Sequence, residues 1–566
     1  MNHIKVFVLL AISNWIAHFW QYASFGLYED DFYRITRVME ATWTQVWEII
    51  LEGGGQGRPL HDGLIYLFSF LGIKLGGLHF VYWIGYLIIT LNSFLFYILL
   101  KYLSNQQVFV VTGAIAFCLF PADTTQAFLT HSLGIQPSLM FLLLALYFYV
   151  SGKKKLSYLT IVGTLLCYET MYPVFLSAPL LKNIKQKWNS KVAEELLRHC
   201  LILGVLIVCA VIVRKLTLNS IGVISNPSIL FAIITSIRNM IIGPIFSMSM
   251  FLYRPFYTLL ALDGNMAVVL LLCFAGFVWV LFRLKLNTSG NPLRLTISDE
   301  SKIFTLEVPQ FFKNHIQLAL SGLVMLVLAY PLTLTTYAVS INGRSSRVHA
   351  SAIIGASILC AYICSAILFI AITYCKKRLA SLSLAGFFTL LIEFGLIVQQ
   401  DYKLSWQYQR EFWTNVVRLC PHINDGTIIL IESTSFHNPK QIDAYGWSIP
   451  LILDSIYQFP EHWKIIPIIY MLQPQWQKEM VSERNSFQLS KTVFWLPWLN
   501  SKRFKSNETV ESSNVILLEV KNEELMRITG PLVINGHEFR LKENSVSELL
   551  LFNKGPLYNY LIKNVE

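Results

Sequence analysis

The sequence predicts an α-helical membrane protein that crosses the bilayer about eleven times, with interfacial helices on its outer face and a small C-terminal α/β domain. Of its 566 residues, 54% are hydrophobic and only 14% are charged, and the mean hydropathy is +0.51. Soluble domains carry about 25% charged residues, so this composition excludes a soluble enzyme. The long apolar runs end near residue 400. We therefore expect a transmembrane domain over 1–400 and a separate domain over 401–566.

Each expected span is an apolar run that approaches or exceeds the roughly 20 residues a helix needs to cross a bilayer. The run over 4–20 contains polar residues and no clean cleavage site, so we interpret it as a retained first span. Glu169 and Pro173 interrupt the run over 157–181, which predicts two short helices there. The other spans are expected near 78–100, 106–121, 133–150, 198–216, 265–284, 316–333, 350–375 and 379–398.

The distribution of Lys and Arg predicts the orientation, because cytoplasmic loops of membrane proteins carry the excess of these residues. The chain has 45 Lys and Arg against 34 Asp and Glu. A cytoplasmic amino terminus places the cation-rich segments 153–155 and 376–378 inside, provided that 59–76 lies on the outer surface as an interfacial helix. The expected outer loops are then 21–77, 121–132, 217–263 and 334–349. The C-terminal domain also lies outside.

The tail over 401–566 has a soluble composition with two strand-like or apolar runs, at 427–432 and 463–472. These runs, separated by charges and prolines, favour a small α/β domain. No zinc-finger spacing or basic and aromatic surface module occurs, so no nucleic-acid partner is expected.

Three adjacent carboxylates follow the first span at Glu29, Asp30 and Asp31. Carboxylates at a membrane surface can take a proton from a hydroxyl or hold a divalent cation that bridges phosphate oxygens. They can equally be a solvated acidic patch that helps to set the topology. If the chain binds a metal, Asp30 and Asp31 are its expected ligands, but no cofactor is certain.

A glycine-rich segment, Gly53 to Asp62, lies in the same outer loop. Its glycines allow close approach of the backbone, and Arg58 offers a planar fork suited to phosphate. Asp62 is a further candidate for substrate binding. A simple connector between two helices is the alternative.

Polar residues of a second outer turn, Asp123 and His131, face the same side under this topology. Glu169 also points outward from the break between its two short helices. An ionisable residue inside an apolar run is a functional-site hypothesis by default, with a packed or water-satisfied Glu as the alternative.

Three arginines complete the candidate site: Arg254 in the second large outer loop, and Arg344 and Arg347 in the short turn before the span at 350–375. Cations are disfavoured next to the membrane on the outer side, so an anionic partner is expected. A lipid-linked phosphate or pyrophosphate fits this role. Headgroups of bulk lipid are the alternative.

This arrangement resembles the GT-C class of membrane glycosyltransferases, which includes protein O-mannosyltransferases and the aminoarabinose transferases of lipid A. The resemblance rests on the acidic pair Asp30 and Asp31 after the first span, and on Gly-Arg-Pro-Leu at 57–60, where those families have a His-Pro-Pro-Leu-type segment. An outer turn with Asp123 and a broken helix pair around Glu169 also match. The likeness covers roughly residues 1–400, as architecture more than as sequence.

The resemblance implies transfer of a sugar from a polyprenyl-phosphate carrier to a hydroxyl of a glycan, lipid or protein, at the outer face of a bacterial inner membrane. Asp31 or Asp30 would be the base, and Arg344, Arg347, Arg58 and Arg254 would hold the donor phosphate. Glu29, Asp62, Asp123, His131 and Glu169 would bind substrate. A single displacement predicts inversion at the sugar carbon. The tail lacks a WWDYG-like motif, which argues against N-glycosylation of proteins.

A transporter, flippase or ligase of lipid-linked saccharides is the alternative function. A transporter should carry charged residues at mid-depth in several spans and paired half-repeats, and neither feature is evident in the sequence. A receptor with an outer sensory tail would explain the C-terminal domain but not the acidic cluster.

Overall fold

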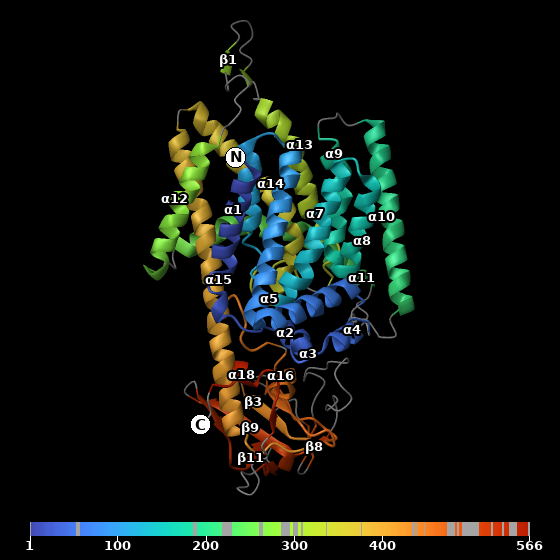
Figure 1. Ribbon diagram of the computed structural model, residues 1–566, viewed down its shortest axis with the longest axis vertical. Coiled ribbons are helices and arrows are strands. Elements are labelled where there is room, and N and C mark those ends of the chain that lie inside the picture. The colour runs from blue at the N-terminus through green and yellow to red at the C-terminus, as the bar shows by residue number, and fades with distance from the viewer. Residues whose placement is uncertain are drawn as a thin grey trace. The chain divides into compact units, whose positions relative to one another are not determined.

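The computed structural model of the chain forms two units (Figure 1). The first unit contains Met1–Ala23 and Trp47–Gln400, and the second contains Ser24–Val46 and Asp401–Glu566. The structure describes residues 2–51, 57–184, 189–217, 229–259, 264–284, 295–297, 304–306, 310–334, 337–374, 376–432, 436, 438–446, 448–472, 481–483, 486–488, 509–521, 524–534, 537–542 and 552–563.

The first unit is a bundle of helices, coloured from blue to yellow in Figure 1. Its helices are α1 His3–Asn14, α5 Pro59–Leu103, α6 Gln107–Cys118, α7 Gln136–Val150, α8 Lys154–Cys167, α9 Ala178–Lys182, α10 Ser190–Thr217, α11 Ile229–Leu259, α12 Ala267–Arg283, α13 Gln310–Leu328, α14 Ile353–Thr373 and the first part of α15 Lys377–Leu419. A short hairpin, β1 Leu295–Ile297 with β2 Phe304–Leu306, precedes α13.

Seven helices among the described residues are long and apolar enough to cross a membrane, which is compatible with a multi-pass membrane protein. They are His3–Ser24, Pro59–Leu103, His131–Val150, Ser190–Arg214, Leu230–Leu259, Gly343–Ile372 and Lys377–Leu419. This is fewer than the about eleven crossings expected from apolar runs near 20 residues in length. The difference arises partly because three further apolar helices are short: Gln107–Cys118, Ala267–Arg283 and His315–Leu328.

The backbone of α5 breaks at Gly76 and Gly77, where the sequence predicted that a helix over 59–76 would end and a span over 78–100 would begin. Gly77 has φ 70°, a conformation that side chains with a Cβ rarely adopt. A Cβ on Gly72 would lie 2.9 Å from the Val81 backbone N, so the two halves of α5 pack closely next to the break. The glycines therefore allow the chain to change direction here.

The contacts of α1 and α5 define the two ends of the bundle. The rings of Phe7 and Phe94 pack at 5.2 Å, and those of Trp15 and Trp83 at 4.6 Å, so α1 and the second half of α5 run antiparallel. Tyr102 at the end of α5 also contacts the ring of Tyr147 near the end of α7. We call this end, which carries Lys5, Lys101 and the lysines at 153–155, the lysine end.

Three interrupted helices lie at the opposite end, which we call the broken-helix end. They are the π-helix η3 His131–Ile135 and the 3-10 helices η4 Glu169–Ser177 and η6 Gly343–Ala352. The His18 ring nitrogen Nε2, near the end of the first span, lies 3.0 Å from the Cys118 carbonyl O at the end of α6. The turn that leads from α6 to η3 therefore starts at this end.

The range 217–263, expected as an outer loop, contains the 31-residue helix α11. The helix contains Pro244 and Pro255, a residue type that usually interrupts an α-helix. Side chains along α11 contact the connection between α13 and α14: Ser236 donates to the Pro331 O, Asn239 to the Thr333 O, and Arg254 to the Ile341 O. The helix thus follows the broken-helix end over much of its length.

The second unit contains a four-stranded sheet in the order β10-β9-β3-β5. Its strands are β3 Ile428–Glu432, β5 Ile468–Leu472, β9 Val515–Lys521 and β10 Glu524–Arg527, and α16 Ile449–Ile456 connects β3 to β5. Strand β3 is parallel to β5 and β9, and β10 is antiparallel to β9. The strand expected from the run at 427–432 is confirmed, because β3 is buried between two parallel neighbours.

Residues 24–46, expected in an outer loop of the transmembrane domain, pack within the second unit. They form α2 Asp30–Arg34, α3 Thr36–Met39 and the start of α4 Trp43–Leu51. The Tyr28 hydroxyl donates to the Tyr402 O at 2.8 Å, and the Trp406 ring covers Gly26 so closely that no Cβ would fit there. Tyr28 and Tyr402 are 374 positions apart, so no local sequence pattern could predict that their segments pack together.

Packing of α15 on the first span predicts a position-specific effect of adding one methyl group. A Cβ on Gly395 would collide with the backbone carbonyl of Ala17, whereas a Cβ on Gly386, in the same helix, would meet no atom closer than 4.0 Å. We expect Gly395→Ala to destabilise the protein by about 1–3 kcal/mol through overpacking, and Gly386→Ala to be neutral or stabilising. Thermal unfolding of both purified variants tests this, and equal melting temperatures would contradict the packing described.

Candidate functional site

The broken-helix end concentrates irregular backbone and polar side chains in one region of the first unit. Non-α-helical backbone at membrane depth is tolerated only where protein covers it or where it lines a hydrated cavity, and π-helical turns occur often at functional sites. η3 contacts α5, and η4 contacts η6. The three interrupted elements therefore bring together segments that are far apart in the sequence.

Arg58, Glu169 and Arg214 form an ion-pair cluster at this end. The Arg58 Nε and Nη2 donate to the two carboxylate oxygens of Glu169 at 2.9 and 2.7 Å, and the Arg214 Nη2 lies 3.4 Å from Glu169 Oε2. Arg58 also lies over the Tyr168 ring, 4.9 Å from its centroid. Glu169 therefore occupies two of the donors of the Arg58 guanidinium group.

The electrostatics of this pair favour both charged forms. Burial opposes the charge on Arg58, but the neighbouring Glu169 carboxylate outweighs it and raises the pKa of Arg58. Burial also tends to raise the pKa of Glu169, but the charge and hydrogen bonds of Arg58 bring this pKa below its ordinary value. Both side chains are about one fifth exposed, at 22% and 23%. The bidentate geometry is the stronger form of such a pair.

Two further candidates, Asp62 and His131, are buried in the first unit. Asp62 is buried in the first turn of α5 and adds to the field that favours charge on Arg58. The ring of His61 approaches η3 so closely that a Cβ on Gly134 would lie 2.5 Å from it. His131 is buried as well, and its ring packs against Phe128 at 5.3 Å.

Asp123 is the centre of a second polar cluster, which joins the turn after α6 to η6. Its Oδ1 accepts hydrogen bonds from the Thr125 backbone N at 2.9 Å and hydroxyl at 2.5 Å, and from the Ser346 hydroxyl at 3.4 Å. Ser346 also accepts from the Thr124 backbone N at 3.0 Å. Burial raises the pKa of Asp123, and the hydrogen bonds and the charge of Arg347 only partly oppose this.

The three expected phosphate-binding arginines of the later segments have different environments. Arg344 and Arg347 lie on η6 and are half-buried. Arg254 is only 2% exposed, and its Nη2 donates to the Ile341 O at 2.7 Å and to Asn342 Oδ1 at 2.9 Å. Arg254 therefore holds the residues immediately before η6 and does not face open solvent.

A buried network that the sequence did not single out lies next to Arg254. The Tyr330 hydroxyl, the Ser247 hydroxyl and His349 Nδ1 lie within hydrogen-bonding distance of one another, at 2.5 to 3.0 Å. His349 Nε2 also contacts the Ser340 O at 3.1 Å. His349 lies two residues after Arg347 in the sequence, but its partners come from α11 and from the residues that follow α13, so only the tertiary structure identifies them.

The acidic cluster lies in the second unit. Asp31 is fully buried, and its Oδ2 accepts from the Tyr28 backbone N at 3.3 Å, whereas Asp30 is half-buried. Glu29 adopts φ 48°, a strained conformation for a residue with a Cβ, and its carboxylate packs against Gly446. The neighbouring Phe32 is buried as well.

Two expectations concern residues without a described site. Gly53 to Gln56 of the glycine-rich segment lie outside the described residues. Among the residues that are described, which include Glu29, Asp30 and Asp31, no group of three or more His, Cys, Asp or Glu side chains is arranged to hold a metal ion.

Comparisons with known proteins leave the chain without an identified relative, since no family model, no curated protein and no solved structure matches it.

The structure thus divides the candidate residues into groups. It brings Arg58, Asp62 and Glu169 together at the broken-helix end, where Arg214 joins them. A second group at this end joins Asp123 with Arg347, on segments 121–126 and 343–352. Glu29, Asp30 and Asp31 belong to the other unit.

The opposite pKa shifts of Asp123 and Glu169 predict opposite pH dependences. The raised pKa means that folded Asp123 binds its proton more tightly than the unfolded chain does. Its ionisation therefore costs stability as the pH rises above the unfolded value near 4. Hence Asp123→Asn should become more stable relative to the unmodified protein between pH 4 and 7.

Glu169→Gln provides the control of opposite sign. The lowered pKa of Glu169 stabilises the fold above the unfolded value near 4.3, and this contribution is lost as the pH falls. Glu169→Gln should therefore be less stable than the unmodified protein at pH 7, and the difference should shrink toward pH 4. Melting temperatures across this pH range provide the measurement. Parallel pH curves for the two variants would be incompatible with these environments.

Proposed function

We propose that the chain is a membrane glycosyltransferase that moves a sugar from a polyprenyl-phosphate carrier to a hydroxyl acceptor on the outer face of the membrane. The observation that carries this proposal is the buried cluster of Asp123, Ser346 and Arg347 at the broken-helix end. It combines a carboxylate and a cation, the two kinds of group that transfer from a lipid phosphate requires.

The distribution of lysines supports an outer location for this cluster. Lys154 and Lys182 both bind Glu195, at 2.6 and 3.0 Å, and so gather the ends of α8, α9 and α10 at the lysine end. Cytoplasmic loops carry the excess of Lys and Arg. If the lysine end is cytoplasmic, then the broken-helix end, with Asp123 and Arg347, faces outward.

The same orientation supports about eleven crossings, with the tail outside. For this count, the first half of α5 and the whole of α11 must remain at the outer face. The break at Gly76 and Gly77 and the contacts of α11 with residues 331–342 agree with such an arrangement. Each of the remaining apolar helices then crosses once, including the pair that meets near Glu169.

Arg344 and Arg347 are our proposed contacts for the donor phosphate. They are three residues apart on a 3-10 helix, which has three residues per turn, so they lie on the same face. A guanidinium group can bind phosphate oxygens through two parallel hydrogen bonds. Arg254 stabilises the residues immediately before η6, because it donates hydrogen bonds to the Ile341 O and to the Asn342 side chain.

The reaction is a single displacement at the anomeric carbon. The acceptor oxygen forms a bond to that carbon, the bond from the carbon to the phosphate oxygen breaks, and the polyprenyl phosphate departs. A carboxylate takes the hydroxyl proton of the acceptor, and inversion at the sugar carbon follows from the single step. Asp123 is a carboxylate of the first unit whose electrostatic partner is Arg347, one of the two proposed phosphate contacts.

The acidic pair of the second unit stays an independent candidate for the base. Asp30 is half-buried and Asp31 is fully buried, so Asp30 is the more accessible carboxylate of this pair. Substitution of each Asp by Asn separates the three possibilities, since Asn retains the shape but cannot take the proton. A chelator in the same assay tests whether transfer requires a divalent cation.

The proposed orientation predicts where reporter domains are active. A reporter that functions only in the cytoplasm should be inactive after Glu566 but active when inserted at the exposed turn around Gly152, at the lysine end. Both fusions are read in intact cells, with the total amount of each protein measured as a control. A cytoplasmic signal after Glu566 would contradict the outer tail and the count of crossings.

The proposed chemistry predicts that donor binding and transfer are lost in different variants. Arg344→Lys and Arg347→Lys should weaken binding of a radiolabelled polyprenyl-phosphate sugar, because Lys lacks the bidentate fork. Asp123→Asn should bind the donor but lose transfer by about 10²–10⁴, and Asp30→Asn and Asp31→Asn are measured in parallel. Lys376→Gln, an exposed cation at the other end, serves as the control.

The outcomes of this assay separate the competing functions. Normal donor binding in both arginine variants would refute the phosphate site. Normal turnover in all three Asn variants would leave the reaction without its base. If the purified protein transfers sugar from no polyprenyl-phosphate donor but moves a lipid-linked saccharide across a vesicle membrane, it is a transporter or flippase.

A further inference from the structure

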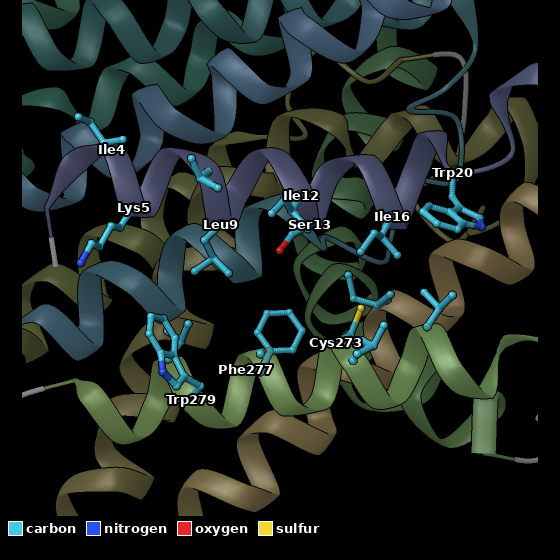
Figure 2. Close-up of a pocket in the computed structure, with 16 residues that line it drawn as sticks. Ile4, Lys5, Leu9, Ile12, Ser13, Ile16, Trp20, Cys273, Phe277 and Trp279 are labelled. Atoms are coloured by element: carbon cyan, nitrogen blue, oxygen red, sulfur yellow. The ribbon is translucent and has the colours of Figure 1, made fainter.

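A long apolar groove separates α1 from α12 in the first unit (Figure 2). Side chains of α1 from Ile4 to Ser13 form one wall, together with Ile16 and Trp20 beyond the end of α1. Side chains of α12 from Val269 to Val280 form the other wall, and Ile392 of α15 also lines the groove. The cavity has a volume of about 610 Å³. No atom lies within 4 Å of the position that a Cβ on Gly276 would occupy, so the middle of the groove is open.

The walls of the groove are almost entirely hydrocarbon and face outward. Ile12 on α1 is 53% exposed, and Leu272 on α12 is 69% exposed. Both helices are apolar, so the groove exposes hydrocarbon side chains. From residue 4 to residue 20 the groove is about 24 Å long, close to the roughly 30 Å of a hydrocarbon core. Trp279 and Trp20 lie near the two ends of the groove (Figure 2). Tryptophans of membrane proteins are enriched at the two membrane–water interfaces.

Among the described residues, cations gather at the end of the groove that Lys5 lines. Lys5 lines it, and Arg283, one turn beyond the lining residue Trp279, lies over that ring at 4.5 Å. Lys377 approaches the last carbonyls of α12, with its Nζ 3.4 Å from both the Phe282 O and the Leu284 O. Within the described part of the chain, no carboxylate pairs with Lys5 or Arg283. The lysine end of the groove is therefore positively charged.

We propose that the groove between α1 and α12 binds an anionic phospholipid, with an acyl chain along the apolar walls and the phosphate at Lys5 and Arg283. Basic pockets between membrane helices recognise anionic headgroups in this manner. One leaflet accounts for about half of the hydrocarbon core, so an acyl chain that starts at Lys5 fits within the length of the groove.

The position of the charges favours a phospholipid over the polyprenyl-phosphate donor of the proposed function. Lys5 and Arg283 lie at the lysine end, whereas Arg344 and Arg347 lie at the broken-helix end. A donor with its phosphate at the second pair cannot place the same phosphate at the first. The lipid site thus requires only that the helices span a membrane, and it stands or falls independently of the glycosyltransferase proposal.

The test measures lipid retention by the full-length protein in nanodiscs of phosphatidylcholine with increasing phosphatidylglycerol. Native mass spectrometry counts the lipids that stay bound after the protein is released. We expect selective retention of phosphatidylglycerol. Lys5→Gln and Arg283→Gln should each reduce it roughly fivefold, since one cation near an anionic lipid surface contributes about 1 kcal/mol. Lys376→Gln, also at the lysine end but not among the groove-lining residues, is the matched control.

A second variant tests the apolar part of the site. Gly276→Leu fills the open middle of the groove and should reduce retention of phosphatidylglycerol even with both cations present. Unchanged retention in all variants would overturn the site. Loss only in Gly276→Leu would refute recognition of the anionic headgroup. Displacement of the bound lipid by polyprenyl phosphate but not by excess phosphatidylglycerol would show that the groove holds the donor instead.

Discussion

The constraint on which the first unit depends is that every backbone polar group within a membrane needs an internal partner. Each interruption of a helix frees carbonyl groups, and here polar side chains satisfy several of them. Asn92 donates to the Gln136 O and Ser138 to the Tyr168 O, at 2.9 and 3.0 Å. Arg214 and Arg254 donate to the carbonyls of Leu165 and Ile341. Because the breaks cluster at one end, polar and charged groups cluster there too.

The charged side chains at the broken-helix end affect both the stability of the fold and the proposed site. Charges away from water are costly unless they are paired, and Arg58 and Glu169 meet this requirement with two short hydrogen bonds. Arg254 meets it only in part, with a backbone carbonyl, an amide oxygen and the Phe394 ring at 4.4 Å. A buried Arg254 adds little to the free energy of folding. Its hydrogen bonds to Ile341 and Asn342 instead position the segment before η6.

The sequence predicted the features that follow from local composition and periodicity. These include the apolar helices, the change of direction at Gly76 and Gly77, the break near Glu169 and the buried strand β3. It could not predict which distant segments meet. The union of residues 24–46 with the tail, the partners of His349 and the course of α11 along residues 331–342 all depend on contacts across many positions.

The sequence suggested two separate polar groups: the carboxylates Glu29, Asp30 and Asp31, and the cations Arg344 and Arg347, for which a lipid-linked phosphate is the expected anionic partner. Each group has an interaction within its own unit. Asp31 accepts a backbone hydrogen bond within its own unit, and the charge of Arg347 acts on Asp123 within the other. A transfer reaction therefore needs no carboxylate from the second unit in order to combine a base with a phosphate-binding cation. The role of the acidic pair becomes a separate question from that of the phosphate site, and the two can succeed or fail independently.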